Sequence, residues 1–239
     1  VYKKHIKDAK VGKIKLDQLK SNQLQKLYNE KTKEGYNAKT VKHISVLINS
    51  ALKKAVQLKM IKENVNEMTV LPKRKQYHAQ VLSPLDVNRI IKEANNDELY
   101  PIVILAISTG LRRGEIMALK WKDIDFELRE LQVKGNLCRV PKTVDEKGKT
   151  RYEYKILAPK TSKSRRTIPL TDLALDALKR QKYQQDILKD QYKSIYKDQD
   201  LVFSNEEGSF LNQRIFMNQY HSFLQKYRIP DVRFHDLRH

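Results

Sequence analysis

The uneven distribution of charge along this chain is the feature that most constrains its organisation. The 239 residues include 48 Lys and Arg against 28 Asp and Glu, a formal net charge of +20. Residues 1–80 hold 19 basic and 6 acidic side chains, whereas residues 81–239 hold 29 and 22. This asymmetry predicts a small, strongly basic unit followed by a larger and more balanced one. Such an excess of positive charge favours a polyanionic partner, either nucleic acid or an anionic membrane surface.

Composition excludes several other classes of protein. Gly and Pro number only 7 each, which excludes a collagen-like or low-complexity chain. The longest apolar run, Ile102 to Ile107, is far shorter than the ~18–20 residues of a membrane-spanning helix, and the lysine-rich start at Val1 does not resemble a signal peptide. The single cysteine, Cys138, excludes an intramolecular disulfide and a Cys-based zinc site. We therefore expect a cytoplasmic protein that faces nucleic acid and has no membrane partner.

Helical periodicity dominates the basic region, so residues 1–70 are predicted to form an α-helical unit. Ser21 is a candidate N-cap for a helix that runs to about Glu34, and Gly35 is its natural stop. A second helix is expected from about residue 38 to residue 59. The apolar residues expected on the buried face of this second helix are Val41, Ile44, Ile48, Ala51, Leu52, Ala55 and Val56.

Basic side chains of this region lie largely off the expected apolar face. The segment 71–80 has no periodicity, contains Pro72 and is basic, so we interpret it as an inter-domain linker that lies against phosphates. Lysine contacts to phosphates position a protein on DNA but carry no sequence information. The alternative is an ordinary solvated helix face, and the clustering of charge favours nucleic acid. The candidate DNA-binding residues here are Lys39, Lys42, Lys73, Arg74 and Lys75.

Residues 81–239 combine helical and β-type patterns. The sequence Ser-Pro-Leu-Asp at 83–86 is a strong helix start, and helical patterns continue to Ser108, where Gly110 breaks them. Residues 124–170 carry β-type segments at 131–133 and 154–157, separated by an excursion over 141–149 that predicts a long hairpin loop. Helices are expected again over 173–196 and 212–227. The expected fold class is mainly α with a small antiparallel β-sheet.

Three short stretches of this region carry candidate chemistry, and the first is Thr-Gly-Leu-Arg-Arg-Gly-Glu at 109–115. Gly110 provides a turn after an apolar helix and aims Arg112 outward. A guanidinium binds a phosphate with two hydrogen bonds and remains charged, so it can stabilise an oxyanion. The alternative is a salt bridge between Arg112 and Glu115 near a helix end.

The second stretch runs from Pro159 to Leu170 and is rich in basic residues. Lys160 is expected at the tip of a β-hairpin, from which a lysine can reach into a groove and protonate a leaving oxygen. Lys163 and Arg165 are candidate DNA-binding residues of the same stretch. The alternative is an ordinary exposed basic turn.

The third stretch is His-Asp-Leu-Arg-His at 235–239. His235 and Arg238 are three residues apart, so a helix would place them on one side. A histidine can act as a general acid or base, and an arginine can neutralise a phosphate. A metal site with His239 is also conceivable, but no cluster of Glu and His surrounds it, so no metal is expected.

Together and in this order, the three stretches resemble those of the tyrosine recombinases, the phage integrase family of site-specific DNA recombinases. The similarity extends over essentially the whole chain and is greatest to integrases of conjugative transposons and temperate phages. It implies a SAM-like core-binding DNA-binding domain at 1–70, a basic linker at 71–80, and a catalytic domain at 81–239 that lacks its C-terminal part. The segments that support the core-binding domain are Gly12–Leu16, Asn37–Val41 and Asn64–Asn66.

The resemblance also implies roles for individual residues. The catalytic positions are Arg112, Lys160, His235 and Arg238, with Glu115 in support and no cofactor. The family's nucleophilic tyrosine and a last histidine or tryptophan follow the third stretch, so we expect them beyond residue 239. The implied reaction cleaves and rejoins DNA through a 3′-phosphotyrosyl intermediate, in order to integrate or excise a mobile element.

The implied partner is double-stranded DNA in the nucleoid, bound by a homotetramer on two DNA sites, with a possible accessory excision factor. Two alternatives remain at this point: a non-catalytic DNA-binding module with the same fold, and a related type IB topoisomerase. The sequence that follows residue 239 would distinguish an enzyme from a binding module.

Overall fold

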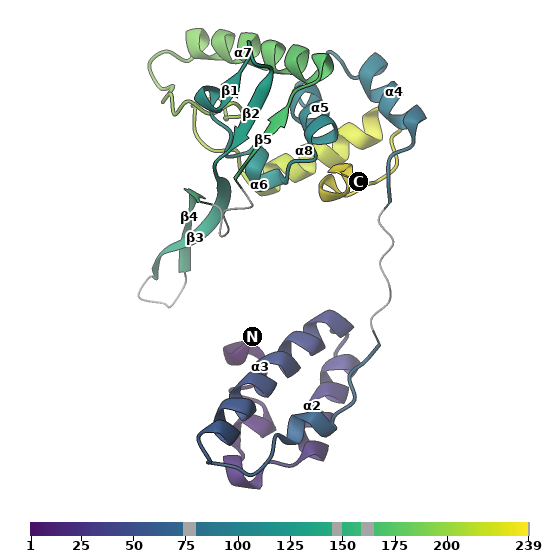
Figure 1. The fold of residues 1–239 in the computed structure, drawn as a ribbon, viewed down its shortest axis with the longest axis vertical. Helices are drawn as coiled ribbons and strands as arrows, with labels where there is room; N and C mark the ends of the chain where they lie inside the picture. Colours follow the sequence, from purple (N-terminus) through teal and green to yellow (C-terminus); the bar gives the residue numbers. More distant parts are fainter. Residues whose placement is uncertain (74–79, 145–149, 159–164, 239) are drawn as a thin grey trace. The chain divides into compact units, whose positions relative to one another are not determined.

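The computed structural model describes residues 1–73, 80–144, 150–158 and 165–238 (Figure 1). The chain divides into two compact units, residues 1–78 and residues 79–239, here called the first and the second unit. Both are built mainly from helices, and the second also contains antiparallel β-strands. The expected fold class, mainly α with a small antiparallel sheet, is confirmed. None of the helices in the described ranges is long and apolar enough to cross a membrane.

The first unit is entirely helical in its described residues. Its core is apolar and lies between α2 and α3, with Leu24, Val41 and Ile44 fully buried. The Tyr28 hydroxyl donates to Asn66 Oδ1, and Asn66 in turn donates to the Ser45 hydroxyl. Its elements are α1 (Tyr2–His5), η1 (Lys10–Lys13), η2 (Leu16–Gln18), α2 (Ser21–Lys33), α3 (Ala38–Gln57) and η3 (Val65–Met68).

Two expectations for the first unit are wrong in detail. Ser21 is the first residue of α2 and not its cap; the Lys20 N–H donates instead to Gln23 Oε1 at 2.8 Å. Ala51 is exposed, and alanine is tolerated there because it is the best helix former and has little apolar surface to bury. Gly35, at a φ of +85°, ends the helix as expected, and α3 ends at Gln57, two residues early.

The second unit packs helices around a small sheet. The helix α5 is apolar on all sides and buried along most of its length, and α7 contacts it. The helical elements are α4 (Pro84–Glu93), α5 (Tyr100–Thr109), α6 (Arg113–Ile116), η4 (Trp121–Asp123), α7 (Asp172–Gln191), α8 (Gln213–Lys226) and η6 (Phe234–Arg238). The strands are β1 (Ile124–Asp125), β2 (Glu130–Val133), β3 (Asn136–Val144), β4 (Thr150–Leu157) and β5 (Arg166–Pro169).

The strands form two separate antiparallel arrangements (Figure 1). One is a three-stranded sheet in the order β1-β2-β5, in which Val133 pairs with Arg166. The other is the two-stranded ribbon β3-β4. The expected loop over 141–149 is wrong in its first part, because β3 continues to Val144. A register shift between Pro141 and Thr143 accommodates the proline, which cannot donate to the ladder.

The helix predictions in the second unit hold with changes at the boundaries. Ser83 caps α4 by accepting from the Asp86 N–H, and Asn212 caps α8. The helical region before Gly110 is interrupted between α4 and α5, and α7 ends at residue 191 and not at 196. The helix α5 contacts both the short α6 and the C-terminal η6.

Candidate active site

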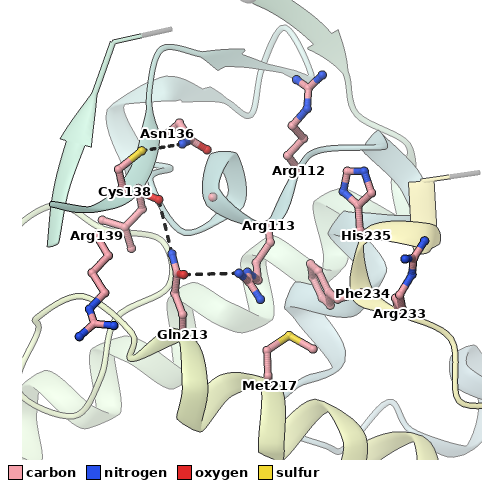
Figure 2. A pocket seen from close by; sticks show the side chains of 12 residues that line it. Arg112, Arg113, Asn136, Cys138, Arg139, Gln213, Met217, Arg233, Phe234 and His235 are labelled. Atoms are coloured by element: carbon pink, nitrogen blue, oxygen red, sulfur yellow. Dashed lines mark hydrogen bonds between the residues drawn. The ribbon is translucent and has the colours of Figure 1, made fainter. Parts of the chain in front are cut away.

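The turn after α5 places Arg112. Gly110 adopts the left-handed conformation at a φ of +62°, which a glycine accepts without strain. The chain then becomes extended at Arg112, the N-cap of α6, and its side chain is 52% exposed. Figure 2 shows the Arg112 guanidinium directed away from α8, the helix that carries Gln213 and Met217.

The buried carboxylate of Glu115 binds Arg112 and orients it. The Glu115 side chain is only 6% exposed; its Oε2 accepts the Arg112 backbone N–H at 2.9 Å, and its Oε1 accepts from Arg112 Nη1 at 2.9 Å. Arg166, the first residue of β5, donates to the same carboxylate. Burial raises the pKa of Glu115, but the hydrogen bonds from Arg166 and Arg112 outweigh it and hold the pKa below its ordinary value. The Arg112–Glu115 salt bridge, which the sequence offered as the alternative to a phosphate-binding role, is present.

The element η6 contains residues 235–238 of the third stretch. It is a 3₁₀-helix, in which residues three apart lie directly above one another, so His235 and Arg238 share a side. Phe234 anchors the element, with its ring centroid 5.1 Å from those of Phe216 and Tyr220. A Cβ added at Gly110 would lie 3.8 Å from the Cβ of Arg238, so the glycine turn rests against this arginine.

His235 and Arg112 line the same pocket, which has a volume of about 630 Å³ (Figure 2). We call it the basic pocket after the arginines and the histidine that line it: Arg112, Arg113, Arg139, Arg233 and His235. Two of the predicted catalytic residues, Arg112 and His235, therefore line one pocket, and the Cβ of Arg238 lies beside the glycine turn that precedes Arg112.

Several pocket residues were not predicted from the sequence. Arg113 donates to Gln213 Oε1 at 3.4 Å, and Gln213 donates to the Leu137 carbonyl at 3.4 Å, which ties α6, α8 and β3 together (Figure 2). Arg233 forms a forked pair with Asp236, whose side chain is 1% exposed. Arg113 lies within the first stretch, next to Arg112, and could have been found from it; the pairing of Arg113 with Gln213 spans 100 residues and leaves no local signal.

The remaining predicted residues are either exposed or outside the described ranges. Lys39, Lys42 and Lys73 are exposed in the first unit, and Arg165 is exposed immediately before β5. The candidates Arg74, Lys75, Lys160, Lys163 and His239 lie outside the described residues. In the ranges that the structure does describe, no cluster of three or more His, Cys, Asp or Glu side chains is arranged to hold a metal.

The strands on either side of the lysine stretch do not pair with each other in the described residues. Instead β4 pairs with β3, and β5 pairs with β2. The sequence pattern could not show this, because alternation predicts a strand but does not say with which strand it pairs. The prediction that Lys160 lies at the tip of a β-hairpin falls outside the described residues and stays a prediction.

Comparisons with known proteins show the family to which the chain belongs. The Phage integrase family model matches residues 80–239. The chain is 29% identical to a tyrosine recombinase XerC-like protein of Caldanaerobacter subterraneus subsp. tengcongensis, over 100% of this chain and 63% of that protein. It is 24% identical to the ICEBs1 integrase of Bacillus subtilis, over 86% of this chain and 53% of that protein. The chain thus spans less than two thirds of the length of either relative.

Two solved structures share the fold. The Tn1549 transposon integrase in complex with a circular intermediate DNA has a TM-score of 0.77 at 19% identity, covering 98% of this chain and 74% of that one. A lambda integrase dimer bound to a COC' core site has a TM-score of 0.63 at 17% identity, covering 93% and 56%. The family model covers well over half of the sequence and includes the motifs of Arg112, His235 and Arg238. The chain therefore belongs to the phage integrase family of tyrosine recombinases.

Proposed function

We propose that this chain binds duplex DNA and supplies most of the active site of a site-specific recombinase, which integrates or excises a mobile element through a 3′-phosphotyrosyl intermediate. The observation that carries the proposal is that Arg112 and His235 line one basic pocket of the second unit and that Arg238 lies beside the turn that precedes Arg112. Membership of the phage integrase family supports it, as do the similar Tn1549 and lambda integrase structures, which are complexes with DNA.

The two units have different tasks in this proposal. Residues 1–70 act as a core-binding domain, residues 71–80 as a basic linker, and residues 81–239 as the larger part of a catalytic domain. Exposed basic residues contact phosphates along the duplex and set affinity without reading sequence. We further propose that the active assembly is a homotetramer on two DNA sites, with an accessory factor that favours excision. The DNA contacts proposed are Lys39, Lys42, Lys73, Arg74, Lys75, Lys163 and Arg165.

The proposed reaction is a metal-free phosphoryl transfer. A tyrosine oxygen, supplied from beyond residue 239, attacks the phosphorus of a phosphodiester. The bond from phosphorus to the 5′ oxygen breaks, and the tyrosine becomes esterified to the 3′ phosphate. The 5′-hydroxyl that leaves then attacks the phosphotyrosine of a partner strand, which restores a phosphodiester and releases the tyrosine. No external energy source is needed because each step exchanges one phosphate ester for another.

The residues of the site suit the charges that develop in this reaction. The attacked phosphate gains negative charge, and Arg112 and Arg238 provide fixed donors for it. Arg112 is suited to this task because Glu115 orients one edge of its guanidinium and leaves the side chain half exposed. Lys160 protonates the leaving 5′ oxygen, and His235 assists in placing or deprotonating the nucleophile.

A covalent-capture experiment tests the proposal. A nicked suicide substrate containing the element's end is incubated with a form of the protein extended beyond residue 239 to include the tyrosine, and a denaturant-resistant protein–DNA adduct is expected. Arg112→Ala and Arg238→Ala should reduce adduct formation by at least ~10²-fold, the size of effect for lost oxyanion donors.

The matched control is Arg180→Ala, because Arg180 lies on α7 and does not line the basic pocket; this variant should leave adduct formation unchanged. DNA binding without any adduct in the extended protein would favour the non-catalytic module, and an adduct that forms equally well in Arg112→Ala would contradict the roles assigned here.

A further inference from the structure

The carboxylate of Glu115 binds two guanidinium groups, and the two bonds differ in kind. Arg166 donates Nη2 to Oε2 at 2.9 Å and Nη1 to Oε1 at 3.3 Å, so both oxygens are engaged by one planar fork. Arg112 uses a single guanidinium nitrogen, Nη1, at 2.9 Å from Oε1. Forked pairing of arginine with a carboxylate is the stronger and more directional form.

Arg166 and Arg112 also differ in the exposure of their side chains. The Arg166 side chain is 31% exposed, whereas that of Arg112 is 52% exposed and lines the basic pocket. The charge of the buried Glu115 is therefore balanced mainly by Arg166. Arg112 is oriented by the carboxylate but keeps the larger part of its guanidinium available to an anion at the surface.

The backbone explains why Arg166 can serve as this partner. Arg166 begins β5 and is paired with Val133 of β2, so its Cα is held by the sheet. It also follows the segment 159–164 directly after Arg165, six positions beyond Lys160. The Arg166–Glu115 ion pair therefore connects the first residue of β5 to α6, the helix that follows Arg112.

We propose that Arg166 is a positioning residue, which neutralises Glu115 through its fork so that Arg112 stays oriented and available for the phosphate that is cleaved. This inference rests on the proposed role of Arg112. It predicts that loss of Arg166 weakens contact with that one phosphate and not with the rest of the duplex, because Arg166 acts through Arg112.

A phosphate-specific binding experiment tests the proposal in the 239-residue chain. Affinity is measured for a duplex of the element's end and for the same duplex with a neutral methylphosphonate at the cleavage position, mapped from the covalent adduct. The unaltered chain should prefer the natural duplex by about tenfold, in the range for a charged hydrogen-bonded contact. Arg166→Gln should lower this preference to about twofold, and Arg112→Ala combined with Arg166→Gln should show no more loss than Arg112→Ala alone.

The neighbouring residue provides the matched control. Arg165→Gln removes an exposed arginine at the adjacent position, and it should weaken binding to both duplexes equally and leave the preference unchanged. Arg166→Lys should keep an intermediate preference, because a lysine is a point charge that cannot bind both oxygens at once. This variant carries the test if Arg166→Gln does not fold, as judged by circular dichroism and melting temperature.

The outcomes separate the two proposals. If the unaltered chain shows no preference for the natural phosphate, the role proposed for Arg112 fails and the role of Arg166 fails with it. If the preference exists and a folded Arg166→Gln or Arg166→Lys retains it in full, the role of Arg166 alone is overturned. Additive losses in the double variant would also overturn it, because they would show that Arg166 acts independently of Arg112.

Discussion

Lys31 and Glu34 in the first unit, and Arg112 and Glu115 in the second, are both ion pairs between residues three apart, with closest distances of 2.8 and 2.9 Å. Their surroundings differ. Glu34 is 48% exposed, whereas Glu115 is 6% exposed and also binds Arg166. In the first unit a half-exposed acid pairs with a lysine whose side chain is only 15% exposed, and in the second a buried acid holds arginines in place.

This difference separates two uses of positive charge. We expect exposed lysines such as Lys39 and Lys42 to follow phosphates in many geometries and so to contribute affinity that salt weakens. Arg112 and Arg233 of the basic pocket, held by Glu115 and Asp236, have fewer geometries available, and we expect them to suit a single phosphate. Spacing in the sequence is the same for all of these ion pairs; burial of the acid is what distinguishes them.

The largest effect expected is on salt dependence, which concerns the exposed charges. The affinity of the chain for duplex DNA should fall ~10³–10⁵-fold between 50 and 200 mM salt, the loss for ~6–10 phosphate contacts. Fluorescence anisotropy over that range measures it. An affinity that changes little would show that the exposed lysines do not contact the backbone.

A second prediction concerns the chemistry of the pocket. In the extended protein, Lys160→Ala should leave DNA binding nearly intact and slow cleavage ~10²–10⁴-fold, as for a lost general acid. A substrate with sulfur in place of the leaving 5′ oxygen needs little protonation and should recover most of the rate. Failure of that substrate to recover it would place Lys160 among the DNA contacts.

The free energy of unfolding should fall much more when Glu115 is replaced than when Glu34 is replaced. Glu115→Gln sets an amide NH₂ against guanidinium donors and breaks a buried ion pair, so the free energy of unfolding of the second unit should fall by about 3–5 kcal/mol. The matched change Glu34→Gln should cost at most about 1 kcal/mol, because the Glu34 carboxylate is half exposed and remains solvated. Urea denaturation of each variant measures both values, and similar losses would contradict the comparison.

The pH dependence of the Glu115 contribution has a definite sign. Since the pKa of Glu115 in the folded state lies below its ordinary value of 4.5, the ionised carboxylate stabilises the fold at every pH above about 4.5. That contribution should decline as the pH falls through the lower, folded-state pKa. The difference in stability between the unaltered chain and Glu115→Gln should therefore be constant near neutrality and shrink in acid.

The smallest effect expected comes from individual surface lysines. Replacing both Lys39 and Lys42 by Gln should reduce the salt slope by about 2 and weaken binding about tenfold at low salt. The preference for a natural phosphate over a methylphosphonate at the cleavage position should not change. A loss of that preference would mean that the first unit also sets the geometry of the pocket.

Local sequence signals predicted the parts of the fold that depend on local physics. Ser83 caps a helix as predicted, and Gly35 and Gly110 end helices in the left-handed conformation. The motifs of Arg112, His235 and Arg238 were likewise visible, and the structure brings them together, although their roles remain predictions.

Long-range contacts were not predictable in this way. The pairing of Arg166 with Glu115 joins residues 51 positions apart, and the sheet partners of β4 and β5 depend on tertiary packing rather than on alternation. Pro141 indicated a loop, yet a register shift in the ribbon accommodates it within β3. The placement of Lys160 falls outside the described residues and stays a prediction.

A methylphosphonate scan tests whether the basic pocket holds a single phosphate of the DNA. Each phosphate of the element's end is replaced in turn by a neutral methylphosphonate, and the affinity of the 239-residue chain is measured for every duplex. If the basic pocket holds one phosphate, a single position should stand out with a loss of about tenfold, and Arg112→Ala should abolish that peak while leaving the smaller losses elsewhere. Losses spread evenly along the duplex, with no peak that depends on Arg112, would contradict the account.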